Sequence, residues 1–253
     1  MNRKVYIAVT AALASMLLWS CGESDNKTAK KNATQNVTEA QTEEKIENAI
    51  DYESDGEPVK DATVFGENTY VFSPEDDKNE IQSKVDEIYK KQETNQFGKE
   101  RYAILFKLGE YDTALSVNVG YYTQVSGLGV LPTDTNINKL WVNADWMYHN
   151  ATCNFWRSAE NFSVNEYCMW ANSQAVSLRR MKFNDGMVLS DGEGWSSGGF
   201  MADCYSNGTV SSGSQQQYLT RNDFWRLWDG GVWNMVFVGI DTVRTPAGTW
   251  PYS

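Results

Sequence analysis

Three consecutive glutamines stand in an aromatic part of the chain, within the segment SGSQQQYLTRND from Ser212 to Asp223. A primary amide offers both hydrogen-bond donors and acceptors, so a row of amides can bind neutral polar groups. Glutamine runs usually indicate low complexity and disorder. If this run forms a strand instead, its side chains alternate between two faces. The outward amides among Gln215, Gln216 and Gln217 then line a binding surface.

The only histidine, His149, and the cysteines are the other side chains with obvious chemistry. No nucleophile-elbow motif accompanies His149, so we expect a turn or surface histidine rather than a member of a Ser-His-Asp triad. Cys153, Cys168 and Cys204 form no C-x-x-C pair, and the sequence therefore predicts no metal site and no cofactor. In an oxidising compartment two of these cysteines can form a disulfide, and free thiols are the alternative.

The composition favours a neutral ligand. The 253 residues carry a formal net charge of −11. Because phosphate binding requires a basic face, this charge argues against a nucleic-acid partner. Sugars fit the charge balance better. Hydrophobic residues make up 41 % of the chain and aromatic residues 13 %, which is enough to bury a sizeable core.

The N-terminus is typical of a bacterial lipoprotein signal, which we assign to residues 1–21. Arg3 and Lys4 form a basic start, and the apolar stretch that follows is too short to predict a membrane span. It ends in LWSC, which resembles a lipobox with Cys21 as the acylated residue. The next residues, GESDN, resemble an export signal of surface lipoproteins. We therefore expect a lipid anchor at the bacterial outer membrane or cell surface, with an ordinary cleaved secretion signal as the alternative.

Composition separates a linker from a folded domain. Residues 22–61 are rich in Asn, Thr, Glu and Lys, and they offer too little apolar surface to offset the entropy of ordering the chain. We predict a flexible tether there, which suits an anchored surface protein. From residue 62 to residue 253 the pattern changes to that of an ordered domain.

One helix and a series of short strands are expected in this domain. Ile81, Val85 and Ile88 lie at helical spacing behind an acidic first turn, which predicts an amphipathic helix from about Pro74 to Thr94. The remainder consists of short segments rich in β-branched and aromatic residues. Gly, Asn, Asp or Ser turns separate these segments, as is typical of strands.

The spacing of the strands favours an all-β fold, a right-handed parallel β-helix. Phe162, Met181 and Cys204 fall at matching places in successive segments, about 20 residues apart, a period that suits a β-helix. The early helix would cap the open end of the coil. A β-sandwich is the alternative, but the Asn-Gly hairpins that it favours are scarce here.

Seven stretches carry a resemblance to a known family. They are NQFGKERYAILFKLGEYD, VGYYTQVSGLG, NFWRSAEN, NSQAVSLRRM, GWSSGGFMAD, GSQQQYLTRND and VWNMVFVGID. In this order they closely resemble the N-terminal half of glycoside hydrolase family 55, the exo-β-1,3-glucanases or laminarinases of bacteria and fungi. The resemblance runs from about Val64 to Tyr252 and covers nearly the whole folded part.

The resemblance implies a fold and a chemistry. Family 55 enzymes have two tandem β-helices with the active site between them, and they release glucose from β-1,3-glucan with inversion. The general acid and the carboxylate that assists the attacking water come from the second β-helix. By the same resemblance, Gln174 and Ser197 on the first β-helix position that water through hydrogen bonds. Alternatively, the two residues only satisfy each other on a polar coil.

The resemblance also implies a sugar-binding surface. Trp195, Gln215, Gln216, Gln217 and Tyr218 would lie along the cleft, because aromatic faces stack on pyranose rings and amides bind hydroxyls. Core packing is the alternative for the aromatic residues.

By this resemblance the chain ends near the linker between the two β-helices, so the half with the catalytic carboxylates is absent. No motif supports Glu160, Asp191, Glu193 or Asp203 in their place. We therefore expect a laminarinase-like domain that is inactive alone, with a second β-helix chain encoded nearby as its partner. The alternatives are a non-catalytic β-glucan-binding module, a structural surface β-helix, and a polysaccharide lyase, which would need Ca²⁺-binding Asp clusters.

Overall fold

The computed structural model describes residues 65–231 and 234–240. The predicted signal peptide with Cys21, the predicted linker of residues 22–61, and the residues from 241 onward lie outside this part. Within it the predicted fold is confirmed, since the chain forms a right-handed parallel β-helix with one α-helix near its start. No helix among the described residues is long and apolar enough to cross a membrane.

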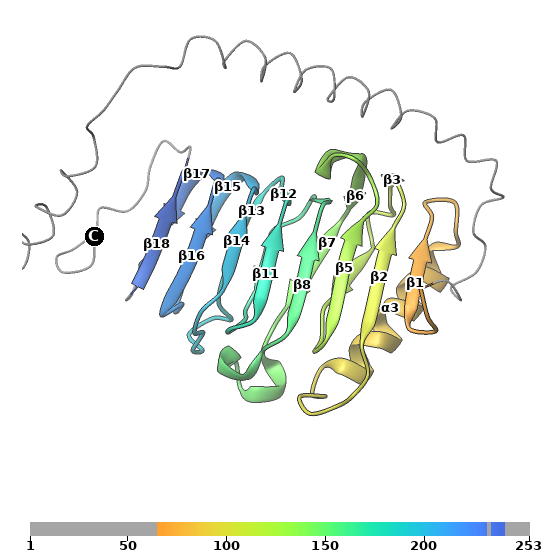
Figure 1. Ribbon diagram of the computed structural model, residues 1–253, viewed down its shortest axis with the longest axis horizontal. Helices are drawn as coiled ribbons and strands as arrows, with labels where there is room; N and C mark the ends of the chain where they lie inside the picture. Colours follow the sequence, from red (N-terminus) through yellow and green to blue (C-terminus); the bar gives the residue numbers. More distant parts are fainter. Residues whose placement is uncertain (1–64, 232–233, 241–253) are drawn as a thin grey trace, which may run out of the picture. The chain divides into compact units, whose positions relative to one another are not determined.

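The first wall of the coil is an 8-stranded parallel sheet, seen face-on in Figure 1. Each strand pairs with the equivalent strand of the next turn, so segments far apart in the sequence lie side by side. In spatial order the strands are β1 (Thr69–Phe72), β2 (Tyr102–Phe106), β5 (Thr123–Gly127), β8 (Arg157–Glu160), β11 (Val176–Arg179), β14 (Phe200–Ala202), β16 (Gln217–Arg221) and β18 (Asn234–Val238).

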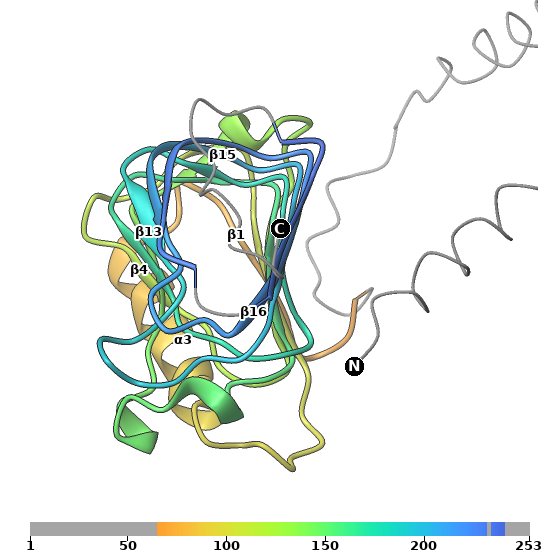
Figure 2. The same ribbon diagram turned by 90° about the vertical axis from the view of Figure 1, so that its left-hand side faces the viewer.

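A 10-stranded parallel sheet closes the coil. It consists of two ladders that meet in the long strand β15, where the register shifts between Ser206 and Thr209. Figure 2 shows the turns of the coil end-on. The first ladder is β3 (Gly109–Glu110), β6 (Thr135–Ile137), β9 (Ser163–Val164), β12 (Lys182–Phe183), β15 (Tyr205–Ser211) and β17 (Phe224–Asp229); the second is β4 (Ser116–Asn118), β7 (Lys139–Val142), β10 (Cys168–Trp170) and β13 (Gly186–Val188), which also pairs with β15. Short 3-10 turns are η2 (Pro132–Asp134), η3 (Asp145–Met147) and η4 (Ala151–Cys153).

Hydrophobic side chains form columns inside the coil, because equivalent residues of successive turns face the same way. One buried column of the first wall is Ile104, Val125, Ala159, Leu178 and Met201. The predicted equivalence of Phe162, Met181 and Cys204 is confirmed, since each is buried and directly precedes the paired residues of β9, β12 and β15. The sequence period is therefore the length of one turn of the coil.

The predicted amphipathic helix is α3 (Lys78–Gln92), within the expected range. Asp77 begins it by accepting hydrogen bonds from the backbone N–H groups of the next turn. Ile81, Val85 and Ile88 are buried against the coil, as their spacing predicts. The helix therefore adds its apolar face to the core at one end of the coil (Figure 1).

The side chain of Gln82 on α3 pairs with the edge strand β4. Its amide oxygen accepts from the backbone N–H of Ser116 at 2.9 Å, and its amide nitrogen donates to the carbonyl of the same residue at 2.9 Å. An open strand edge is a template for association with another chain. The helix thus satisfies this edge in place of a further strand, which is the capping role predicted for it.

The three cysteines in the described part are free thiols. Cys168 and Cys204 are buried inside the coil, and burial raises the pKa of both thiols well above the ordinary value. Cys153, the last residue of η4, is half-buried. Of the two sequence alternatives, free thiols rather than a disulfide are what the structure contains.

Candidate functional site

The glutamine run leads into strand β16, and its three amides lie in three different environments. Gln215 is fully buried, Gln216 is half-buried, and Gln217 is exposed on the outer face of the first wall. The segment is ordered, but the three glutamines do not alternate as residues of one strand: Gln215 precedes β16 and is buried, although it lies only two residues before the exposed Gln217. Among the three, Gln217 therefore presents its amide most fully to solvent.

The buried amide of Gln215 holds the backbone of the preceding turns. Its oxygen accepts from the N–H of Gly198 at 2.9 Å. Its nitrogen donates to the carbonyls of Asn172 and Leu189, at 2.8 Å and 2.9 Å. The expectation that Gln215 binds sugar is therefore corrected, because its hydrogen-bonding groups are used inside the coil.

A groove of about 520 Å³ crosses β11, β14, β16 and β18 on the outer face of the first wall. Small residues, including Ala175 and Gly198, line it between the amides of Gln174 and Gln217. A Cβ placed on Gly198 would lie 3.5 Å from Cγ of Gln217 and 3.6 Å from Cγ of Gln174, so the two amide side chains flank this glycine. Gly198 has φ of +97°, a conformation that glycine adopts without strain. The row of amides continues to Asn234, which pairs with Gln217 in the next turn.

Gln174 and Ser197 lie on neighbouring turns of the coil. The N–H of Gln174 donates to the carbonyl of Gly198 at 3.1 Å, and the N–H of Ser197 donates to Oγ of Ser173 at 2.7 Å. Gln174 is exposed and lines the groove, whereas Ser197 is half-buried and is not among the described lining residues. The two residues are thus adjacent, and their shared water-positioning role stays a prediction.

A stacked aromatic pair extends the same outer face. The rings of Tyr122 and Trp156 lie 5.2 Å apart with an interplanar angle of 12°. The guanidinium of Arg101 lies 3.5 Å from the centroid of the Tyr122 ring. A second hollow of about 210 Å³ is lined by both aromatic residues and by Ala175, which also lines the groove. The two hollows therefore adjoin on one surface.

Trp156 and the next residue, Arg157, point to opposite sides of the wall. Trp156 is 43 % exposed, whereas the side chain of Arg157 is buried and donates to the carbonyl of Val119 at 2.7 Å. Burial lowers the pKa of Arg157 to about 10, and the guanidinium lies 4.8 Å from the ring centroid of Tyr121. Trp156 was not among the predicted site residues, because tryptophan is more often buried in a core than exposed.

Two aromatic residues predicted to bind sugar have other surroundings. Tyr218 is 3 % exposed, its ring packs against Trp228, and it reaches only the bottom of the groove beneath Gly199. Its prediction as a stacking residue is corrected, since both faces of a buried ring are covered. Trp195 is 61 % exposed, but it lies on the loop before β14 and is absent from the described lining of both hollows.

No carboxylate in the described part of the chain lines either hollow. Glu160 lies on the outer face of β8 and accepts from the amide of Gln124 at 2.8 Å. Asp203 lies at a corner, 4.0 Å from the guanidinium of Arg221, and Glu193 is exposed on the loop before β14. Inverting hydrolysis requires two carboxyl groups about 6.5–9.5 Å apart across the scissile bond. The groove supplies neither of them.

A larger hollow, of about 730 Å³, lies beside the start of α3 and does not include the predicted site residues. Its lining contains Asp76, Asp77, Glu110 and Asp112, with Lys78 3.2 Å from the Asp112 carboxylate. This acidic lining suits a neutral polysaccharide less well than the amide-lined groove. Size alone therefore does not identify the candidate site.

Known proteins are similar to this chain in sequence and in fold. No family model matches the chain. Over 191 residues the chain is 47 % identical to an exo-β-1,3-glucanase of Streptomyces sp. (strain SirexAA-E / ActE), a match that covers 74 % of this chain and 31 % of that protein. The chain is a partial homologue of a family 55 exo-β-1,3-glucanase. The predicted resemblance is thereby confirmed.

Solved structures agree with the family 55 relationship. The structure of sacteLam55A from Streptomyces sp. SirexAA-E matches with a TM-score of 0.69 at 45 % identity, over 74 % of this chain and 34 % of that one. A variant of the same enzyme, solved in complex with glucose, matches equally well. The chain thus spans about a third of the length of the proteins that it matches, in their N-terminal part.

Replacing Gln215 by alanine should destabilise the domain, whereas Gln217→Ala should not. Gln215→Ala removes three hydrogen bonds to buried backbone groups, at about 1 kcal/mol each, so we expect the free energy of unfolding to fall by about 3 kcal/mol. Gln217 is exposed, and its loss should change that free energy by less than about 0.5 kcal/mol. Urea unfolding of both variants measures the difference. Equal midpoints would show that Gln215 has no structural role.

Proposed function

We propose that the chain binds β-1,3-glucan along the outer face of the first wall. The observation that carries this proposal is one continuous surface of amides and aromatic rings, without lining carboxylates, in the region homologous to an exo-β-1,3-glucanase. The glucose complex of the related enzyme supports the same ligand class.

The chemistry of the surface suits a chain of glucose units. A pyranose has an apolar face of C–H groups, which stacks on an exposed ring such as that of Trp156, and a rim of hydroxyls. The amides of Gln174, Gln217 and Asn234 can donate to and accept from that rim. Neighbouring strands lie about 4.8 Å apart, so the surface from β5 to β18 spans about 24 Å, enough for several glucose units.

We propose further that the described residues position the attacking water but do not move its proton. The Gln174 amide can hold a water by hydrogen bonds and has no group that takes up a proton near neutral pH. Inverting hydrolysis also needs a general acid and a general base. Both carboxylates would therefore come from outside the described residues, on the same polypeptide or on a second β-helix chain.

The purified chain should bind laminarihexaose without releasing glucose from it. Titration calorimetry should detect binding, and Trp156→Ala should weaken it about tenfold, since an aromatic stacking contact contributes up to about 1.5 kcal/mol. Arg226, exposed on β17 in another wall, offers a matched control, and Arg226→Ala should bind like the wild type. Glucose in the same samples should stay at the level of buffer alone.

Each other outcome identifies a different function. Absence of binding would favour a structural surface β-helix. Binding without hydrolysis after addition of a second β-helix from the same locus would indicate a non-catalytic binding module. Glucose release by the chain alone would show that one of its own carboxylates, such as Glu160 or Glu193, acts as the acid.

We also propose that Cys21 is acylated and holds the protein at the bacterial cell surface. The proposal is supported by the basic residues Arg3 and Lys4, the apolar stretch and the LWSC sequence. Labelled palmitate should enter the wild-type protein and should not enter Cys21→Ala. Equal labelling of the two proteins would refute the lipid anchor.

A further inference from the structure

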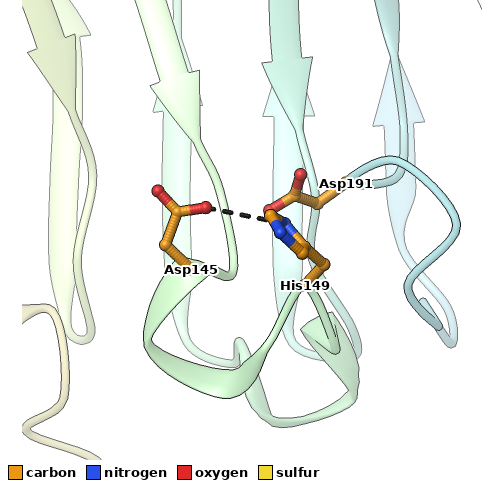
Figure 3. Close-up of side chains that lie close together, drawn as sticks. All are labelled: Asp145, His149 and Asp191. Carbon is orange, nitrogen blue, oxygen red and sulfur yellow. Dashed lines mark ion pairs between the residues drawn. The ribbon is translucent and has the colours of Figure 1, made fainter.

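Three side chains of metal-ligand type converge beside the loop that leads to Ser197 (Figure 3). Nδ1 of His149 lies 3.1 Å from Oδ2 of Asp191 and 3.6 Å from Oδ1 of Asp145. All three atoms lie within 4.8 Å of one another. Ligand atoms at about 2.1 Å from a cation are separated by about 3.0 Å when at right angles and about 3.4 Å in a tetrahedron. The two separations from Nδ1 of His149 are close to those expected between ligands of one small cation.

We propose that Asp145, His149 and Asp191 bind a divalent transition-metal cation of the Zn²⁺ class. One imidazole with two carboxylates is a ligand set that zinc accepts, whereas Ca²⁺ and Mg²⁺ prefer oxygen ligands alone. The side chains of His149 and Asp145 are 60 % and 62 % exposed, so the cation can enter from solvent and complete its coordination with water.

Neighbouring groups orient the two carboxylates. The amide of Asn143 donates to Oδ2 of Asp145 at 2.6 Å, which leaves Oδ1 directed at the histidine. The backbone N–H of Ala144 donates to Oδ2 of Asp191 at 2.7 Å and fixes that carboxylate, which is almost fully buried. Hydrogen bonds of this kind to ligating carboxylates are typical of metal sites.

The two ion pairs between His149 and the aspartates account for the cluster only when the histidine is protonated. In the described part of the chain the His149 ring makes no aligned hydrogen bond, although Nδ1 lies 3.1 Å from Asp191. Neither carboxylate pairs with a lysine or arginine among the described residues. With a neutral histidine, two negative charges face each other at short range, and a divalent cation would neutralise them.

A cation here would join two segments of the chain. Asp145 and His149 lie at η3, whereas Asp191 begins the loop that carries Trp195 and Ser197. The same segments already meet where the N–H of Ala151 donates to the carbonyl of Trp195 at 2.7 Å. The proposal departs from the sequence-based expectation of no metal site, because its ligands come from different turns of the coil. It does not depend on glucan binding.

The test measures zinc binding by the metal-stripped full chain in a Cys21→Ser, Cys153→Ser background, which removes the accessible thiols. Adding ZnCl₂ should raise the melting temperature, and calorimetry should give one bound Zn²⁺. His149→Asn should weaken zinc binding at least tenfold, because it removes the imidazole while asparagine tolerates the φ of +67° at this position. The matched control is Tyr148→Asn, a neighbour with φ of +53° that is 93 % exposed, and it should bind zinc like the parent.

Asp145→Asn provides a second variant at an exposed position and should also weaken zinc binding. The proposal is overturned if the parent protein binds no zinc, if His149→Asn and Asp145→Asn bind it as tightly as Tyr148→Asn does, or if Ca²⁺ binds more tightly than Zn²⁺. A melting temperature that zinc leaves unchanged at neutral pH would mean that the cluster is only an ion pair of protonated histidine.

Discussion

The register between successive turns determines where every side chain of the first wall lies. Parallel pairing sets Ser177 beside Phe200, Phe200 beside Leu219, and Leu219 beside Val236, so one outward column crosses the wall. The column that contains Ala175, Gly198 and Gln217 follows from the same pairing. The buried amide of Gln215 secures this register, because it binds backbone groups of two earlier turns at once. A change in the register between these turns would therefore break the hydrogen bonds of Gln215 and misplace the amides that line the groove.

The groove differs in charge from the protein as a whole. The sequence has 33 acidic and 22 basic residues, yet the described lining of both outer hollows contains no carboxylate. Binding a neutral sugar and transferring protons to or from it are separable tasks, and this surface is suited to the first. That separation agrees with a homology that covers about a third of an exo-β-1,3-glucanase.

Repetition explains which features the sequence could predict. Ile81, Val85 and Ile88 have helical spacing, and Phe162 and Met181 recur once per turn, so α3 and the β-helix follow from pattern alone. Whether a side chain faces the interior of the coil or the solvent is harder to predict, because at a corner between strands it can do either.

Gln215 and Tyr218 were expected to face outward and instead belong to the interior, while Trp156 faces outward. Contacts between turns are not encoded in local spacing. Asp145 and His149 meet Asp191 only because the coil stacks distant segments, so the cluster was visible in the structure alone.

The most direct test of the account is an NMR titration of the isotope-labelled chain with laminarihexaose. We predict that chemical-shift changes concentrate at the backbone amides of Ala175, Gly198 and Gly199 and at the indole N–H of Trp156. If these signals stay unchanged and the chemical-shift changes occur instead around Asp77 and Asp112, beside α3, the assignment of the outer groove as the glucan site is contradicted.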